Sequence, residues 1–119
     1  MILLVEDDEY LIGIYATKFE LEGFKVLKAS DGKRGFKLAV KETPDIILVD
    51  ILMPGMNGFD LIKKLKNEEK TKNIPVVILS NLGQEKDVRR GIKLGVADYL
   101  IKVHLTPTEI CERVKEIIK

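Results

Sequence analysis

The feature of this sequence that most limits its fold is a regular alternation of short, mostly apolar runs with longer segments of helical period. The five runs cover residues 2–5, 24–29, 46–49, 76–79 and 97–101. Between them, apolar residues recur every three or four positions, which is typical of helices that bury one face. The pattern predicts five βα units. Such units make right-handed crossovers between parallel strands, so the sequence predicts an α/β fold.

The composition of the runs predicts the strand order. The first, third and fourth runs are continuously apolar, as expected of strands that are buried on both faces of a parallel sheet. Lys25 and Lys28 interrupt the second run, and Asp98 and Tyr99 lie in the fifth, so these two runs are predicted to form the edges. A doubly wound (βα)5 sheet of flavodoxin-like order 2-1-3-4-5, with helices on both faces in a three-layer sandwich, is compatible with this arrangement.

The intervening helices have recognisable apolar faces. The last helix opens with Thr106, Pro107 and Glu109, which form a capping box with proline at the first helical position. The apolar faces consist of Leu11, Ile14, Tyr15 and Phe19; of Phe36, Ala39 and Val40; of Ile62 and Leu65; of Val88 and Ile92; and of Ile110, Val114, Ile117 and Ile118.

Length and charge exclude several classes of protein. A chain of 119 residues has room for one domain, residues 1–119, and its 45% hydrophobic and 33% charged content excludes disorder. Twenty Lys and Arg against nineteen Asp and Glu leave a net charge of +1, which argues against nucleic-acid binding. No apolar run approaches the roughly 20 residues of a membrane span, and no signal peptide precedes the first strand, so a cytoplasmic location is expected.

The only cysteine and the only histidine admit two interpretations. Cys111 and His104 have the residue types of a nucleophile and its base. Cys111 also lies in the apolar pattern of the last helix, where a free cysteine usually acts as a small core residue, and this interpretation is favoured. A single cysteine cannot form an internal disulfide, which fits a reducing compartment.

Polar residues follow every strand that is predicted to be central, and also the fifth strand. Ligands of open α/β sheets bind beyond the carboxyl ends of the strands, where the strand order reverses. The residues that converge on this rim are Glu6, Asp7, Asp8 and Glu9 after the first strand, Asp50 after the third, Ser80 and Asn81 after the fourth, and Lys102 after the fifth.

Carboxylates from neighbouring strands repel one another unless a cation lies among them, and Mg²⁺ prefers oxygen ligands of this kind. An Asp beside such an ion can attack phosphorus. Lys102 would add a positive charge, and the Ser80 hydroxyl could donate to a phosphoryl oxygen. The rim therefore predicts metal-assisted phosphoryl chemistry.

Four segments, residues 2–8, 44–58, 75–80 and 95–102, resemble the receiver domain of bacterial response regulators, and the likeness extends over essentially the whole chain. The resemblance implies a phosphorylation-activated switch of a two-component or phosphorelay system. Such a receiver is a signalling module that assists its own phosphorylation and dephosphorylation and is not an enzyme in the usual sense. Its partner is a sensor histidine kinase or a phosphotransfer protein.

The resemblance also implies roles for single residues. Asp50 is the phosphoacceptor, and Asp7 and Asp50 bind Mg²⁺ (or Mn²⁺) together with the backbone carbonyl of Leu52. Glu6 acts on the metal through water, and Asp8 falls outside the acidic pair. Lys102 matches the position of the family's invariant lysine. Ser80 is the switch hydroxyl, and Tyr99 is the aromatic residue that changes rotamer with it, although Tyr99 can also be an ordinary edge-strand aromatic.

Two positions depart from the family pattern. Val103 follows Lys102 where the family usually has a proline in a cis peptide, so either the bond is cis at a high cost or Lys102 approaches by a trans bond. Asn81 stands where the family prefers a small residue. Its amide is a candidate contact to the phosphoryl group, and it is equally a candidate to cap the turn before the fourth helix.

Leu52 and Leu82 occupy the two positions that influence phosphoryl lifetime in the family, two residues beyond Asp50 and two beyond Ser80. Neither side chain can orient an attacking water. Slow self-dephosphorylation is therefore predicted.

The fourth helix carries a basic face of Lys86, Arg89, Arg90 and Lys93, which fits a plain solvated surface. In the family, the surface made by the fourth helix, the fifth strand and the fifth helix binds a downstream protein target or forms a homodimer. A partner role for this face is a hypothesis. Direct nucleic-acid or membrane binding is not expected.

Two other functions share features with this pattern. A haloacid-dehalogenase-like phosphatase also uses a strand-end Asp and Mg²⁺, but it wants a second Asp where this chain has Leu52. A phosphate-independent pseudo-receiver would lack an acidic residue or the lysine, and none is missing here. Because the last helix is predicted to run to Lys119, no output domain is expected to follow, so the chain acts alone or is cut from a longer regulator.

Overall fold

The computed structural model describes all residues of the chain, 1–119. It contains five strands that alternate with five α-helices, and one short 3₁₀ helix between the last strand and the last α-helix. The elements are β1 (Ile2–Val5), α1 (Glu9–Leu21), β2 (Val26–Ala29), α2 (Gly32–Glu42), β3 (Ile46–Val49), α3 (Gly58–Asn67), β4 (Val76–Ser80), α4 (Glu85–Lys93), β5 (Asp98–Ile101), η1 (Lys102–His104) and α5 (Pro107–Ile117).

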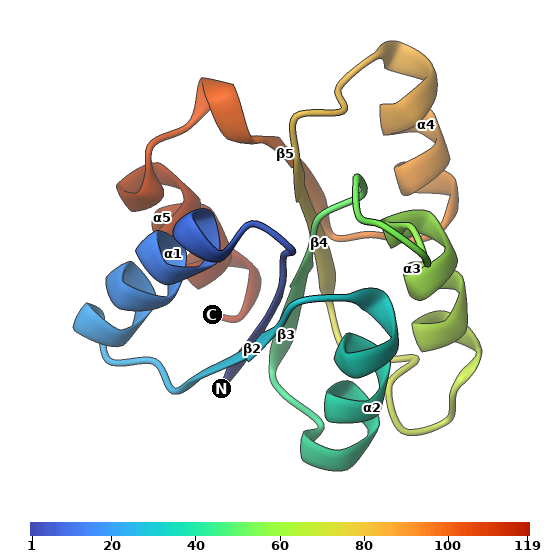
Figure 1. Cartoon of the computed structure of the whole chain (residues 1–119), viewed down its shortest axis with the longest axis horizontal. Coiled ribbons are helices and arrows are strands. Elements are labelled where there is room, and N and C mark those ends of the chain that lie inside the picture. The colour runs from blue at the N-terminus through green and yellow to red at the C-terminus, as the bar shows by residue number, and fades with distance from the viewer.

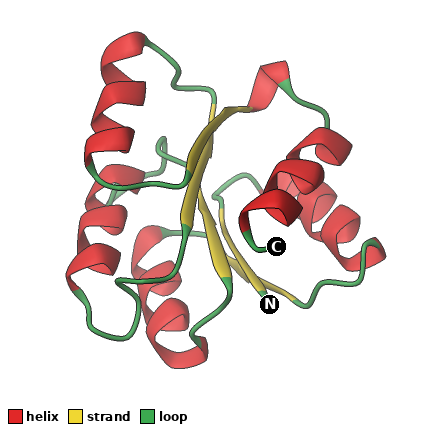
Figure 2. Cartoon of the chain, turned by 180° about the vertical axis from the view of Figure 1, so that it is seen from behind, coloured by secondary structure: helices red, strands yellow, loops and turns green.

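The strands form one parallel sheet in the order β2-β1-β3-β4-β5, which confirms the predicted flavodoxin-like topology. Helices α1 and α5 cover one face of the sheet, and α2, α3 and α4 cover the other (Figure 1). The view from behind shows the same three layers, with the sheet between the two groups of helices (Figure 2).

The core lies in two layers, one on each face of the sheet. Every residue of β1, β3 and β4 is buried, as continuously apolar strands predict, and successive side chains feed alternate layers. One layer includes Leu61, Ile62 and Leu65 of α3, and the other includes Ile110 and Val114 of α5. The predicted inward faces of these two helices are confirmed. Thr106 and Glu109 form the predicted capping box, with Pro107 at the first helical position.

Some element boundaries differ from the predicted ones. The second strand begins at Val26 and not at Phe24, because the Phe24 N–H donates to the Phe19 carbonyl at 3.0 Å and ties this residue to the end of α1. The fifth strand begins one residue late, at Asp98, and α5 ends at Ile117, short of Lys119.

The predicted inward face of α4 is wrong. Val88 is only half-buried and Ile92 is 63% exposed, whereas Asp87 and Gly91 are the buried residues of this helix. A Cβ on Gly91 would lie 2.8 Å from Ile78 Cδ1 and 2.9 Å from Tyr99 Cδ2. The helix therefore approaches the sheet through its backbone at Gly91. With Gly91 at the contact, Val88 and Ile92 do not form the buried face of the helix.

Candidate functional site

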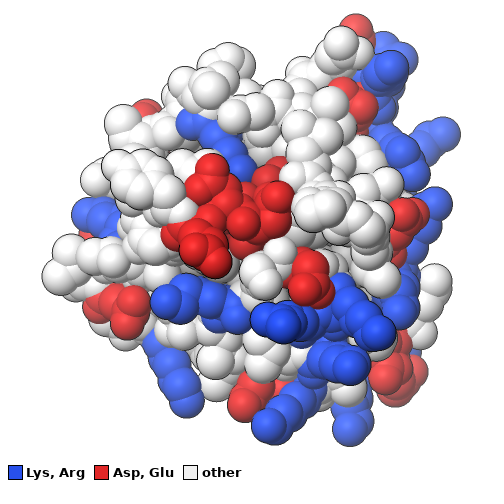
Figure 3. Space-filling model, in the orientation of Figure 1, with Lys and Arg blue, Asp and Glu red and all other residues white.

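Three carboxylates gather where the central strands end. Glu6 and Asp7 follow β1, Asp50 follows β3, and one carboxylate oxygen of each lies within 4.8 Å of the others. Acidic side chains form a continuous group at the centre of this face of the molecule (Figure 3). Glu6 and Asp50 are buried and Asp7 is exposed, so the cluster opens to solvent on one side. A set of hard oxygen donors from two adjacent strands suits Mg²⁺ or Mn²⁺.

Asp8 has a different role from its neighbours. Its side chain is the N-cap of α1 and accepts hydrogen bonds from the N–H groups of Tyr10 and Leu11, at 3.0 and 3.1 Å. These bonds satisfy two of the free donors at the start of the helix. Asp8 is thus outside the acidic cluster, as predicted.

Lys102 reaches the cluster from the edge of the sheet. Its ammonium group lies 3.0 Å from Asp50 Oδ2 and forms a second ion pair with Glu6. The chain contains no cis peptide bond, so the Lys102–Val103 bond is trans. Of the two predicted possibilities, the trans bond is the one observed, and the lysine still reaches Asp50. The Lys102 side chain is only 8% exposed, so both ion pairs are shielded from bulk water.

Burial and charge shift two pKa values in this cluster. Burial, opposed by the hydrogen bond from Lys102, raises the pKa of Glu6 from 4.5 to about 7. Burial alone would lower the pKa of Lys102, but its hydrogen bond to Glu6 and the charge of Asp50 outweigh burial and raise it. Lys102 is therefore a permanent cation at neutral pH, whereas Glu6 titrates near neutrality when no metal is bound.

The backbone after Asp50 turns tightly around its carboxylate. The Leu52 N–H donates to Asp50 Oδ1 at 3.2 Å, and the Gly58 N–H closes the loop by donating to the Ile51 carbonyl at 3.0 Å. A Cβ on Gly58 would lie only 2.4 Å from the Asp50 carbonyl oxygen, so only glycine fits there. Met53 is 7% exposed and packs into the core.

Leu82 connects the two predicted switch residues through its backbone. Its N–H donates to Ser80 Oγ at 3.2 Å, and its carbonyl accepts a hydrogen bond from the Tyr99 hydroxyl. Ser80 is fully buried at the end of β4, and Tyr99 is half-buried on β5. Burial, assisted by the charge of Asp87, raises the pKa of Tyr99 to about 12, so its hydroxyl remains a donor at neutral pH.

Asn81 makes a contact that the sequence did not suggest. Its Oδ1 accepts a hydrogen bond from the Val103 N–H at 3.0 Å, across two loops. Because the Asn81 side chain bonds to Val103 and makes no hydrogen bond to the turn before α4, the predicted turn-capping role is not observed. Side chain-to-backbone bonds between loops carry no local sequence signal, which explains why this one was missed.

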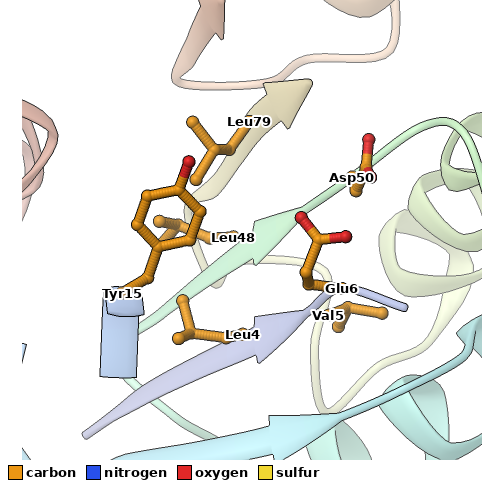
Figure 4. Close-up of a pocket in the computed structure, with 7 residues that line it drawn as sticks. All are labelled: Leu4, Val5, Glu6, Tyr15, Leu48, Asp50 and Leu79. Carbon is orange, nitrogen blue, oxygen red and sulfur yellow. The ribbon is translucent and has the colours of Figure 1, made fainter. Parts of the chain in front are cut away.

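Tyr15 was also missed as a pocket residue, since its position only marks it as part of the apolar face of α1. A small pocket beneath Glu6 and Asp50 is closed by the Tyr15 ring, with Leu4, Leu48 and Leu79 as its apolar lining (Figure 4). Glu6 borders this apolar lining, and burial is the largest cause of its raised pKa.

Cys111 and His104 do not form a catalytic pair. Cys111 is 1% exposed in the core, and burial raises the pKa of its thiol, whereas His104 is exposed on η1. All four basic residues of α4 are exposed, as expected of a solvated face, and two of them also make contacts. Arg89 pairs with Glu85, and the Arg90 guanidinium lies 4.3 Å from the centre of the Phe59 ring, against α3.

The fold and this site define a class of protein: a doubly wound α/β domain with an acidic pocket, a strand-end aspartate and an opposing lysine at the carboxyl edge of its sheet. The sequence matches the response regulator receiver domain family over residues 2–115. The chain belongs to this family. Receiver domains are signalling modules and not classical enzymes; they bind Mg²⁺ at the acidic pocket and take phosphoryl groups from histidine kinases.

The similar proteins differ in how much of their own length this chain covers. The chain is 35% identical over 118 residues to the DNA-binding dual master transcriptional regulator RpaA of Synechocystis, covering 99% of this chain and 48% of RpaA. It is 41% identical over 101 residues to protein PilH of Pseudomonas aeruginosa, covering 85% of this chain and 84% of PilH. The chain spans about half the length of RpaA and 22% of the response regulator PleD of Caulobacter vibrioides.

Solved structures agree with the fold. The receiver domain of the Francisella response regulator 1452 superposes with a TM-score of 0.89 at 33% identity, covering 98% of this chain and 94% of that one. Chemotaxis protein CheY4 of Vibrio cholerae has a TM-score of 0.91 over 98% and 96% of the two chains, and at 23% identity it supports the fold alone. None of the helices is long and apolar enough to cross a membrane. These comparisons favour the receiver over the phosphatase considered from the sequence.

Proposed function

We propose that this chain, residues 1–119, is a phosphorylation-activated switch that accepts a phosphoryl group on Asp50 from the phosphohistidine of a sensor kinase or a phosphotransfer protein. The observation that carries the proposal is the placement of Asp50, buried between Lys102 at 3.0 Å and the carboxylates of Glu6 and Asp7. An aspartate in that position has an exposed entrance, a fixed cation and a metal-ligand set beside it.

Asp7, Asp50 and the backbone carbonyl of Leu52 would hold the metal, and Glu6 would act on it through water. Bound Mg²⁺ (or Mn²⁺) would neutralise charge on the carboxylates and on the incoming phosphoryl group. The chain itself supplies the nucleophile: an Asp50 oxygen attacks phosphorus, and the bond from phosphorus to the histidine nitrogen of the donor breaks. Lys102 offers its ammonium to the charge that develops on the phosphoryl oxygens.

The switch joins the pocket to the surface of α4 and β5. A phosphoryl oxygen on Asp50 would accept a hydrogen bond from the Ser80 hydroxyl, whose Oγ accepts one from the Leu82 N–H, and would draw Ser80 toward Asp50. Movement of Ser80 alters the Leu82 peptide, whose carbonyl holds the Tyr99 hydroxyl. The Tyr99 rotamer and the loop before α4 therefore change together. The surface of α4, β5 and α5 is where we place the downstream target or a second copy of the chain.

The test of the proposed function is incubation with acetyl phosphate and Mg²⁺, followed by intact mass. We expect the mass of one phosphoryl group, lost in Asp50→Ala and retained in Asp60→Ala, which removes an exposed carboxylate of α3. A phosphoryl adduct that persists in Asp50→Ala would contradict the assignment. Repeated turnover of phosphate esters would favour the phosphatase instead.

The adjacent pair Asp7 and Asp8 tests the metal site. Asp7→Asn should weaken Mg²⁺ binding by tenfold or more, because it removes a charged ligand. Asp8→Asn should leave binding unchanged, because asparagine is as good an N-cap as aspartate. Equal loss in both variants would argue against a specific role for Asp7.

A further inference from the structure

A hydrogen bond links the residue that follows the switch serine to the residue that follows the lysine of the pocket. The Val103 N–H donates to Oδ1 of Asn81 at 3.0 Å, although the two residues are 22 positions apart in the chain. Asn81 directly follows Ser80, and Val103 directly follows Lys102. The bond therefore joins the neighbours of both functional residues.

The bond continues the pairing of two strands past the end of the sheet. The register of β4 and β5 ends with Ser80 opposite Ile101. Beyond this pair the backbones separate into the loop before α4 and into η1, and the Asn81 side chain spans the gap between them. A side chain thus replaces the next backbone contact at the point where Lys102 leaves the sheet.

The hydrogen bond to the Val103 N–H restricts the orientation of the peptide that joins Lys102 to Val103. The direction in which the Lys102 side chain leaves the backbone is therefore restricted as well. From the edge strand, the Lys102 side chain must pass β4 to reach Asp50, which follows β3. A lysine side chain has many rotamers. A restrained backbone at Lys102 raises the fraction of those rotamers in which the ammonium reaches the pocket.

Resting on the proposed function, we propose that Asn81 is a positioning residue that holds Lys102 against Asp50 through the Val103 N–H. The donor exists because residue 103 is not a proline, which has no N–H. With Oδ1 engaged by Val103, Asn81 acts on the reaction through Lys102 and not by binding the phosphoryl group.

Amine labelling of the unphosphorylated protein tests this directly. The ammonium of Lys102 is shielded by its two ion pairs, so an acylating reagent should modify it slowly. In Asn81→Ala we expect Lys102 to be labelled at least fivefold faster, with the exposed Lys63 unchanged as an internal reference. Asn67→Ala, which removes an exposed amide from the end of α3, is the matched control. An unchanged labelling rate of Lys102 in Asn81→Ala would overturn the proposal.

A mutant cycle then connects the contact to the chemistry. Asn81→Ala should slow phosphorylation by acetyl phosphate three- to tenfold, in line with the loss of one hydrogen bond. In a Lys102→Ala background the same change should have no further effect, because the lysine it positions is gone. A full effect in that background would show that Asn81 acts on the phosphoryl group itself and would overturn the proposal. Absence of phosphorylation in the unaltered chain would count against the proposed function, while the labelling result would still decide the role of Asn81.

Discussion

Helices α3 and α4 cover the same face of the sheet, but they are held to it very differently. Helix α3 buries four large side chains, Phe59, Leu61, Ile62 and Leu65. Helix α4 buries only Asp87 and Gly91, and its Ile92 is 63% exposed. Elements with few buried apolar contacts open and shift at low cost. The difference marks α3 as a fixed support for the pocket and α4 as the element that can respond to it.

The loops before these helices differ in the same way. The loop before α3 is closed by the bond from the Gly58 N–H to the Ile51 carbonyl and is anchored by buried Met53. The loop before α4 is held by hydrogen bonds that pass through Leu82 to Ser80 and Tyr99. Such bonds can be exchanged for others without opening the core, so a phosphoryl group can act on this loop.

Truncation of a buried side chain should reveal the largest difference in stability between the two helices. Leu61→Ala should lower the free energy of unfolding by about 2–5 kcal/mol, because it leaves a cavity around a fully buried site. Ile92→Ala, at an exposed position of α4, should change it by about 0.5 kcal/mol or less. Urea denaturation of both variants measures the difference. Equal losses would mean that α4 is packed as firmly as α3.

The pH dependence of stability should sharpen the description of the acidic pocket around Glu6. Without divalent metal, the folded chain keeps a proton on Glu6 between pH 4.5 and about 7, where the unfolded chain has lost it. Glu6 therefore favours folding at low pH, and up to about 3 kcal/mol of stability is lost as the pH rises through that window. Above pH 7 its contribution is constant.

Urea denaturation at pH 5 and pH 8, with a chelator present, measures this loss of stability. The difference in the free energy of unfolding between the two pH values should disappear in Glu6→Gln. His104→Gln is the control, because it removes the only histidine and should leave the difference in place. Added Mg²⁺ should stabilise the chain more at pH 8 than at pH 5, since Glu6 is then ionised. A Glu6→Gln variant with the pH dependence of the parent chain would refute the assignment.

The smallest expected effect concerns the two loops directly. Leu52 and Leu82 hold the corresponding places before α3 and α4, and neither can orient water, so phospho-Asp50 should persist for minutes or longer once the donor is removed. Leu52→Asn or Leu82→Asn should shorten that lifetime several-fold, whereas Leu21→Asn, at an exposed position of α1, should not. Quantifying the adduct over time by intact mass measures it. A lifetime of seconds in the unaltered chain would contradict the prediction.

The differences between α3 and α4 also show which parts of the fold and of the site could be predicted from the sequence. The apolar strands and the polar residues that follow them predict the sheet order and bring Glu6, Asp7, Asp50 and Lys102 to one edge, because parallel strands end together. The inward face of α4 could not be predicted, because Gly91 meets Ile78 and Tyr99 through a close backbone approach that leaves no periodic signal.

The contacts of Asn81 and Tyr15 were missed for a related reason. Each depends on a partner outside its own segment: Asn81 contacts Val103 in η1, and Tyr15 of α1 borders the same pocket as Glu6, which follows β1. Residue type and local spacing contain no information about such pairs. The parts of the site that follow from strand ends were predictable, and the parts that follow from packing between loops were not.

Amide hydrogen exchange, measured before and after phosphorylation by acetyl phosphate and Mg²⁺, tests the central claim most directly. We expect exchange to change in residues 81–99, which span the loop before α4, the helix and the start of β5, while the amides of α3 keep their protection. The Asp50→Ala variant should show no change in residues 81–99, and its α3 amides should also keep their protection. Phosphorylation that left α4 unchanged, or that altered α3 equally, would contradict the account of a fixed support and a responsive helix.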